Sequence, residues 1–327
     1  GDSDPDTLQT ITRMGFKNAV RVDDIVRGWH HGRYRALRTN RAREILTELL
    51  PKLMEIISQT PDPDKVLLGF DEFLEGLPAG VQLFAMFQTN PQLITLLIKI
   101  ISMAPRLANH LSSRPAVFDS VLEPSFFENL PPVKKLKIEL SSALSKAEHI
   151  EEVLNYTRRW ARDRQFQVGV QLLHTLITPT ESARAYSAIA EVAVDCITKP
   201  IASEFVGRHG EFGQSETAVL ALGKLGSHEM SADSDLDLVF IYRTGKEVAT
   251  STGNSPLSSS QYFARLSQRQ ISGLTALTPE GGLFKIDTRL RPMGSSGPIA
   301  TSFSAFVEYH HEQAWTWEHM ALTRARV

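Results

Sequence analysis

The sequence predicts an α+β protein, with a large all-helical N-terminal region over residues 1–212 and a small mixed-sheet domain over residues 213–327. Two observations predict this arrangement. Up to about Gly213, apolar residues recur at spacings of three and four, which is the period of an amphipathic helix. After Gly213, short apolar runs are separated by Gly, Ser and Asp, which is typical of strands and loops.

Length and composition limit the classes of protein that need to be considered. The 327 residues exceed what one hydrophobic core usually serves, so two or three domains are expected. With 42% hydrophobic residues, 22% charged residues and a formal charge of −2, the chain is not disordered as a whole. The single cysteine, Cys196, excludes an internal disulfide and a CxxC zinc framework. It stands in an apolar run where we expect it to pack, and a reducing, cytoplasmic location fits best.

Neither a membrane span nor a signal peptide is predicted. The longest apolar stretch, residues 91–105, is shorter than a spanning helix requires and is interrupted by Lys99. The chain begins GDSDPDTLQT, without an initiator Met or a basic segment, and it stops at TRARV without a closing element. We therefore expect a fragment of a longer polypeptide.

The helical region is predicted as a series of helices separated by prolines. The run from Ala42 to Ile57 shows the helical period, and Pro51 is expected to kink or split it. Prolines expected to begin successive short helices are Pro91, Pro105 and Pro115. A link at residues 126–132 marks a possible sub-boundary before a second helical block at residues 133–147, 150–173 and 182–208. In this block the charged residues, Glu151, Glu152, Arg158 and Arg159, are interpreted as solvated helix faces.

The C-terminal domain is predicted to hold three strands, at residues 217–222, 236–242 and 283–290. A Gly/Ser/Thr-rich loop at residues 244–260 and a helix at residues 261–276 separate the second strand from the third. One or two further helices follow from Ser302 to Arg326. Their Trp315 and Trp317 are interpreted as packing residues.

Two carboxylates mark the beginning of the second predicted strand. Side chains two residues apart share a face of a strand, so Asp235 and Asp237 point together, while Leu236 and Leu238 point to the other side. Two like charges this close repel each other unless a cation neutralises them. Oxygen ligands without a His or Cys partner favour Mg²⁺ or Mn²⁺ over Zn²⁺.

The third predicted strand repeats this pattern. By the period of two, Lys285, Asp287, Arg289 and Arg291 share one face, and the apolar residues between them share the other. A third carboxylate beside two guanidinium groups suits a site for metal-bound polyphosphate, because arginine pairs with phosphate oxygens in a planar fork.

Gly226 and Ser227 follow the first predicted strand and are expected to open a helix whose free N–H groups meet phosphate. Each signal has a plainer interpretation, since a Gly-Ser pair also forms ordinary turns and loop carboxylates also cap helices. For Glu229 and Asp233, capping and a catalytic part both stay open. The ordered combination of Gly-Ser, Asp-x-Asp and a later Asp is more specific than any of its parts.

These residues also carry a resemblance to a known family. Gly226-Ser227, Asp235-Leu-Asp237 and Asp287 resemble the signature of the DNA polymerase β type nucleotidyltransferase superfamily. The strings GKLGSHEMSADSDLDLVFIY, IDTRLRPMGSSGPIATS and AWTWEHMALTRARV resemble, more narrowly, the bacterial glutamine synthetase adenylyltransferases. LPAGVQLFAMFQTNPQL and APRLANHLSSRPAVFDSVL extend the similarity to the helical half, so it spans nearly the whole chain.

The resemblance implies a mixed-sheet domain of polymerase β type and a metal-dependent transfer of AMP from ATP to a tyrosine hydroxyl of glutamine synthetase, with release of pyrophosphate. It implies Asp235, Asp237 and Asp287 as catalytic and metal-binding residues, with Mg²⁺ or Mn²⁺ as cofactor and ATP as substrate. The residues that bind the ATP phosphates are implied to be Gly226, Ser227, Arg289 and Arg291. Glutamine synthetase is the implied protein substrate in nitrogen assimilation, and the PII signalling protein is the implied regulator of the full-length enzyme.

Members of this family contain two similar halves, of which one attaches AMP and the other removes it by phosphorolysis. The amino-acid sequence of this chain resembles the C-terminal half, which attaches AMP. A regulatory helical domain is expected to follow Val327. Phosphorolytic removal of AMP from glutamine synthetase is the alternative. Because the same carboxylates would serve both directions, the assignment rests on resemblance.

Two rival classes of function are less favoured by the sequence. A nucleic-acid polymerase or tailing enzyme normally carries a basic footprint, but residues 213–327 hold 11 acidic and 10 basic side chains. A non-enzymatic interaction module on a dead transferase fold is disfavoured because all three carboxylates are present. No nucleic-acid partner is therefore expected.

Overall fold

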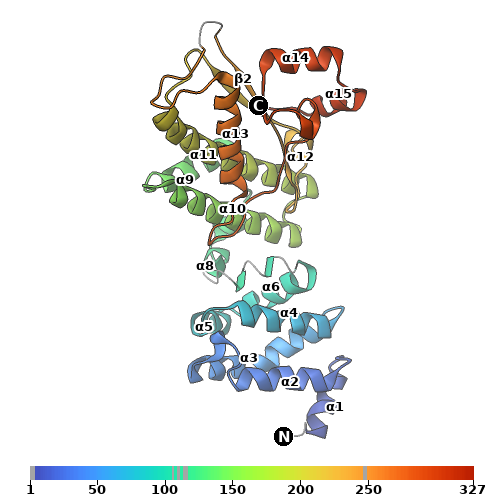
Figure 1. Ribbon diagram of the computed structural model, residues 1–327. Coiled ribbons are helices and arrows are strands. Elements are labelled where there is room, and N and C mark those ends of the chain that lie inside the picture. The colour runs from blue at the N-terminus through green and yellow to red at the C-terminus, as the bar shows by residue number, and fades with distance from the viewer. Residues whose placement is uncertain (1–3, 105–106, 109–110, 113–116, 246–248) are drawn as a thin grey trace. The chain divides into compact units, whose positions relative to one another are not determined.

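The computed structural model describes residues 4–104, 107–108, 111–112, 117–245 and 249–327. It divides into two compact units, Gly1–Glu128 and Asn129–Val327, whose elements are labelled in Figure 1. Helices dominate, and a small mixed sheet lies in the second unit, in agreement with the predicted α+β class. Pro105 and Pro115, which were expected to begin helices, lie outside the described residues. The predicted domain boundary at residues 212–213 stays a prediction.

The first unit is helical throughout its described residues: α1 (Pro5–Arg13), α2 (Ala19–His30), η1 (Arg35–Leu37), α3 (Asn40–Ser58), α4 (Pro63–Gly76), α5 (Val81–Thr89), α6 (Gln92–Met103), α8 (Val117–Val121) and η2 (Pro124–Phe127). The expected split at Pro51 is wrong, because α3 runs through it. Pro51 occupies an exposed position, whereas Leu46, Leu49 and Leu53 are buried. The packing of that apolar face maintains the helix although proline cannot donate a backbone hydrogen bond.

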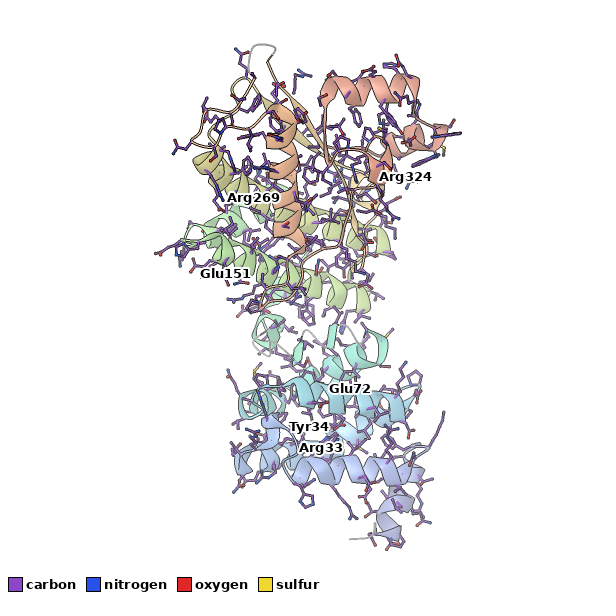
Figure 2. The ribbon with its side chains drawn as sticks, viewed as in Figure 1. Arg33, Tyr34, Glu72, Glu151, Arg269 and Arg324 are labelled. Atoms are coloured by element: carbon purple, nitrogen blue, oxygen red, sulfur yellow. The ribbon has the colours of Figure 1, made fainter. Side chains whose placement is uncertain are left out.

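A partly buried polar cluster crosslinks the first unit. Asp71 on α4 accepts hydrogen bonds from the Trp29 indole at 2.8 Å and from the Tyr34 hydroxyl at 2.9 Å. Burial, followed by the hydrogen bond and the charge of Asp71, raises the pKa of Tyr34 to about 12. Tyr34 and its neighbour Arg33, whose guanidinium lies over the tyrosine ring, are labelled in Figure 2.

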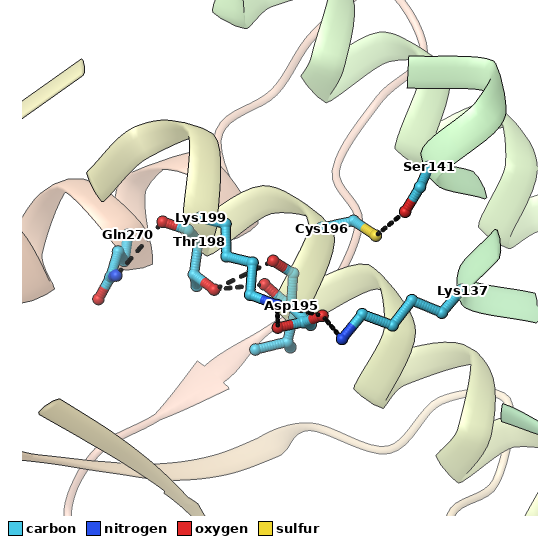
Figure 3. A network of polar contacts seen from close by, with 8 residues as sticks. Lys137, Ser141, Asp195, Cys196, Thr198, Lys199 and Gln270 are labelled. Atoms are coloured by element: carbon cyan, nitrogen blue, oxygen red, sulfur yellow. Dashed lines mark hydrogen bonds and ion pairs between the residues drawn. The ribbon is translucent and has the colours of Figure 1, made fainter. Parts of the chain in front are cut away.

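The second unit opens with three helices: α9 (Val133–Leu144), α10 (Ile150–Leu173) and α11 (Pro179–His209). A capping box at Thr178 and Glu181 begins α11, and Gly210 ends it with a φ of 74°. Figure 3 shows how α9 is fastened to α11. Asp195 of α11 pairs with Lys137 of α9 and, at 2.8 Å, with Lys199. Cys196 is buried beside Ser141, so its predicted packing role is confirmed.

The interpretation of Arg158 as part of a solvated helix face is wrong. Its side chain is fully buried, and the guanidinium donates to the carbonyls of Gly273, Ala276 and Gly281 at 2.7–3.0 Å. A further bond reaches the Leu154 carbonyl of its own helix. Arg158 therefore fastens α10 to the connection that leads from α13 (Ser259–Thr275) toward the third strand. Glu151 is exposed, as predicted, and the neighbouring Arg159 lies at the surface, where it pairs with Glu280.

The mixed sheet centres on β2. Its strands are β1 (Glu216–Ala221), β2 (Leu236–Arg243), β3 (Ile286–Asp287) and β4 (Ala300–Ser302). β1 pairs with β2 in antiparallel orientation, whereas β3 and β4 both pair with β2 in parallel. The first two predicted strands are confirmed within a residue. The third is wrong beyond Ile286–Asp287, because the chain turns at Arg289, and β4 was not predicted.

Both faces of β2 are covered. Leu236, Leu238 and Phe240 pack into the core formed with α11 and α13, and Ile286 of β3 joins this core. On the opposite face, Val239 and Ile241 pack with side chains from α14 (Phe303–Glu312) and α15 (Thr316–Leu322). Asp237 has the same parity as Val239, so it lies on the α14–α15 face of the strand.

The last helices leave several apolar side chains in solvent. Trp315 and Trp317 are 71% and 53% exposed, so their interpretation as packing residues is wrong. The Glu318 carboxylate accepts hydrogen bonds from the Trp315 backbone N–H at 2.8 Å and from the Tyr309 hydroxyl at 2.9 Å, which ties α15 to α14. Among the described residues, no helix has the length and continuous apolarity that crossing a bilayer requires.

Candidate active site

The site is centred on two neighbouring carboxylates. Asp237 of β2 and Asp287 of β3 are direct partners in the parallel register, so two segments far apart in sequence bring their carboxylates together. The Leu236 N–H donates to the Lys285 carbonyl at 2.9 Å, which fixes this register. Asp235 stands just before β2 and is exposed.

Burial and neighbouring charges both act on Asp237. Burial raises its pKa, and the nearby charges of Asp287 and Asp235 raise it further, which places all three groups within electrostatic reach of one another. The Arg289 and Lys224 charges act in the opposite direction. Three carboxylates grouped in this way favour the binding of a cation.

Arg289 already provides a positive charge to Asp287. Its guanidinium lies 2.5 Å from one carboxylate oxygen, and its Nε contacts both oxygens at 2.9 and 3.0 Å. The Arg289 backbone N–H donates to the same carboxylate at 2.8 Å. Together these contacts hold the pKa of Asp287 below its usual value, chiefly through the side-chain hydrogen bond. The Arg289 side chain is itself 77% exposed, so it can move without unpacking the core.

Arg291 has a different environment. Its guanidinium donates to Thr288 at 2.8 Å, to the Gly297 carbonyl at 3.1 Å and to the Ser295 carbonyl at 3.2 Å. These bonds close the loop that follows β3. The predicted common face for Lys285, Asp287, Arg289 and Arg291 is wrong, because the strand ends at Asp287. A phosphate contact by Arg291 stays a prediction.

The Gly226–Ser227 pair ends a helix rather than opening one. α12 (Gly223–Gly226) follows β1 directly, and the N–H groups of Gly226 and Ser227 donate to the carbonyls of Leu222 and Gly223 at 2.8 and 3.1 Å. The expected pair of free N–H groups is therefore wrong. The Ser227 hydroxyl donates to the Glu229 carboxylate at 2.8 Å and to the Gly223 carbonyl at 3.0 Å.

Sequence reasoning missed Gly223. Its φ is +51°, and a Cβ at this position would lie 2.1 Å from the Asp237 carboxylate. The Leu222 N–H also donates to the Asp237 carbonyl at 2.9 Å. α12 and the central carboxylate thus lie against each other, and any side chain at position 223 would displace the carboxylate and strain a backbone with positive φ. A glycine directly after a predicted strand was the available signal.

The donor set fits a hard divalent cation, although the described residues do not form a closed cage. No three His, Cys, Asp or Glu side chains in the described part of the chain are placed to hold one metal ion together. Asp235 is exposed, and Arg289 occupies the oxygens of Asp287. The guanidinium thus stands where a cation would neutralise the carboxylates. Metal ligation by Asp235, Asp237 and Asp287 stays a prediction.

Comparison with known proteins identifies the family. A family model described as glutamate-ammonia ligase adenylyltransferase matches residues 94–327, which is more than half of the chain. The chain belongs to this family. Three curated relatives carry the name bifunctional glutamine synthetase adenylyltransferase/adenylyl-removing enzyme. They come from Mesorhizobium japonicum (44% identical), Brucella melitensis (45%) and Agrobacterium fabrum (44%), each over 99% of this chain. The chain spans about a third of the length of these relatives, 33% in each case.

Proposed function

We propose that this chain transfers AMP from ATP to a tyrosine hydroxyl of glutamine synthetase, with release of pyrophosphate and with Mg²⁺ or Mn²⁺ as cofactor. The observation that carries the proposal is the parallel pairing of Asp237 with Asp287, with Asp235 two residues before Asp237, in a chain of this family. The mixed sheet and its flanking helices then form a nucleotidyltransferase domain of polymerase β type.

The three carboxylates have different roles in the proposed reaction. Asp235 and Asp237 would hold the metal ions, whose charge would stabilise an in-line displacement at the α-phosphate. Asp287 completes the site and accepts the proton of the tyrosine hydroxyl, whose ordinary pKa of about 10 leaves it a weak nucleophile at neutral pH. Arg289 is released from Asp287 when ATP arrives and pairs with its phosphates.

In this proposal the Gly226–Ser227 turn contacts the ATP phosphates, but not through free backbone N–H groups. Because the N–H groups of Gly226 and Ser227 are already bonded within α12, the Ser227 hydroxyl would meet the phosphates, and Gly226 would shape the turn that presents it. Arg291 would act through the loop that it closes after β3.

A second candidate function is favoured by the names of the relatives, which include an adenylyl-removing activity. In that direction inorganic phosphate would attack the phosphorus of the tyrosine-bound AMP at the same carboxylates, which would break the bond to the tyrosine oxygen and release ADP and free tyrosine. Regulation by the PII protein and a cytoplasmic location stay predictions for the longer enzyme.

Transfer of label from α-labelled ATP to purified glutamine synthetase tests the attaching reaction. We expect label on the glutamine synthetase band, on a tyrosine, in the presence of Mg²⁺ and not with a chelator. Asp237→Asn should abolish labelling, whereas Glu308→Gln, a change at an exposed carboxylate of α14, should not. Label on RNA or DNA instead would reject the proposal. Release of label from adenylylated glutamine synthetase with phosphate, without any attachment, would favour the removing direction.

Calorimetric titration with ATP tests the metal bridge separately. Binding should require Mg²⁺ or Mn²⁺ and should weaken strongly in Asp235→Asn and in Asp237→Asn, because these carboxylates supply the metal ligands. Unchanged far-UV circular dichroism would show that both variants remain folded. Equal ATP affinity with and without chelator would exclude the metal bridge.

A further inference from the structure

The last described segment of the chain is fastened to the Gly226–Ser227 turn. The Arg326 guanidinium donates to the Gly226 carbonyl at 2.9 Å through Nε and to the Leu225 carbonyl at 3.0 Å through Nη2. Its Nη1 donates to the Glu191 carboxylate of α11 at 3.1 Å. One side chain therefore connects the end of α12 to the longest helix of the unit.

The backbone of the same segment is also fixed against the turn. Arg326 and Ala221 exchange two backbone hydrogen bonds, at 2.8 and 3.0 Å, at the end of β1. A Cβ on Gly226 would lie 2.0 Å from the Arg324 carbonyl oxygen, so Gly226 allows the two segments to touch. The backbone contacts of Arg326 therefore fix its position independently of its side-chain bonds to the turn.

The chemistry of these contacts requires arginine. The last carbonyls of a helix lack partners within the helix, and Leu225 and Gly226 are consecutive residues at that end. A planar guanidinium reaches two neighbouring carbonyls and a carboxylate at once, whereas a lysine ammonium is a single point charge on a flexible stem.

α12 transmits this restraint to the catalytic centre. Its last two carbonyls are held by Arg326, and its first residue, Gly223, lies against the Asp237 carboxylate. Ser227 follows directly and donates back to the Gly223 carbonyl. A shift at the Arg326 end of this four-residue helix therefore moves both the phosphate-binding turn and the surroundings of Asp237.

We infer that Arg326 is a positioning residue for nucleotide transfer, which fixes the Gly226–Ser227 turn relative to Asp237 without touching ATP. Glu191 orients the guanidinium for this task. The inference rests on the proposed function for its catalytic consequence, but the restraint on the turn can be measured without any nucleotide.

The test compares Arg326→Gln and Arg326→Lys with a matched control in the 327-residue chain. The control is Arg324→Gln, because the Arg324 side chain, labelled in Figure 2, is exposed two residues away. Amide hydrogen exchange, measured by mass spectrometry on peptides covering residues 223–229, reports the turn. Steady-state kinetics report KM for MgATP, KM for glutamine synthetase and kcat.

Arg326→Gln should speed exchange in the turn and raise KM for MgATP by roughly 10- to 100-fold, the range typical when a group that orients site ligands is removed. KM for glutamine synthetase should not change, and Arg324→Gln should match wild type in every measurement. Arg326→Lys should not rescue the turn, because charge alone cannot hold two carbonyls. Glu191→Gln should cause a smaller change in the same direction.

Wild-type exchange and wild-type KM for MgATP in Arg326→Gln would overturn the inference, as would full rescue by Arg326→Lys. If Arg326→Gln does not fold, Arg326→Lys and Glu191→Gln provide the same two readouts. If wild type neither binds nor uses ATP, the proposed function fails, and the exchange rates alone then decide whether Arg326 holds the turn.

Discussion

Replacing Arg158 with Met should be among the most destabilising single changes in the second unit. Methionine keeps much of the apolar stem but removes every donor from a fully buried site. The carbonyls of Gly273 and Ala276 lose the guanidinium, while Gly281 keeps a bond from the Thr278 N–H at 3.3 Å. Hydrogen bonds from a charged group are worth about 1.5 to 3 kcal/mol each. The variant no longer buries a charge, which offsets part of the loss, so we expect a net loss of about 3 kcal/mol.

Arg159→Met is the matched control, because it removes the same functional group from the next position of α10. Arg159 pairs with Glu280 at 2.7 Å, but its side chain is 43% exposed. Such surface pairs contribute about 0.2 to 1 kcal/mol. Urea denaturation followed by far-UV circular dichroism gives both values from the shift of the transition midpoint at constant slope. Equal losses in the two variants, or a loss below about 1 kcal/mol for Arg158→Met, would refute the assigned role of burial.

Three further predictions concern the site and the first unit. Asp287→Asn should lower single-turnover transfer by roughly 10² to 10⁴-fold, and raising the pH from about 7 to 9 should partly restore it, because more of the acceptor tyrosine ionises unaided; a mutant profile parallel to wild type would remove Asp287 from the role of base. Without ATP, Arg289→Gln should bind Mn²⁺ more tightly than wild type, because the Asp287 carboxylate no longer has the guanidinium as its partner. The same variant should bind MnATP more weakly, because the phosphates lose that guanidinium. Electron paramagnetic resonance titration measures both affinities, and unchanged values would contradict the proposed move of Arg289 from Asp287 to the ATP phosphates. Tyr34 has a folded-state pKa of about 12 against an ordinary value of 10, so its contribution to stability is complete below about pH 10 and is lost as pH rises toward 12; Tyr34→Phe should reduce this alkaline loss in thermal unfolding, and an unchanged pH dependence would exclude Tyr34 as its source.

The sequence predicted those parts of the fold that depend on local periodicity. The strand at Leu236–Arg243 and its two faces follow from alternation, because Leu236 and Leu238 pack against α11 while Asp237 points to the other side. The helices α10 and α13 were likewise located from their apolar spacing. Patterns of this kind record which side of an element is buried, so they survive without tertiary information.

Features that depend on contacts between distant segments could not be read in this way. Arg158 has the composition of a solvated face, and only the loop that ends at Gly281 makes it a buried donor. The alternation around Asp287 looked like a long strand, but β3 ends where Arg289 folds back onto that carboxylate. The role of Arg326 is equally invisible locally, because its partners lie 100, 101 and 135 residues earlier in the chain.

The parallel pairing of β3 with β2 covers only two residues, Ile286 and Asp287. This brevity has a consequence for the order of assembly. β1 and β2 are neighbours along the chain and share a six-residue register, whereas β3 joins only after the intervening segment with α13 has closed. Asp287 should therefore be the last carboxylate to reach its place during folding and the first to leave it by local opening. The site should therefore come apart at a lower denaturant concentration than the rest of the fold. Activity and circular dichroism would then give two distinct midpoints in denaturant.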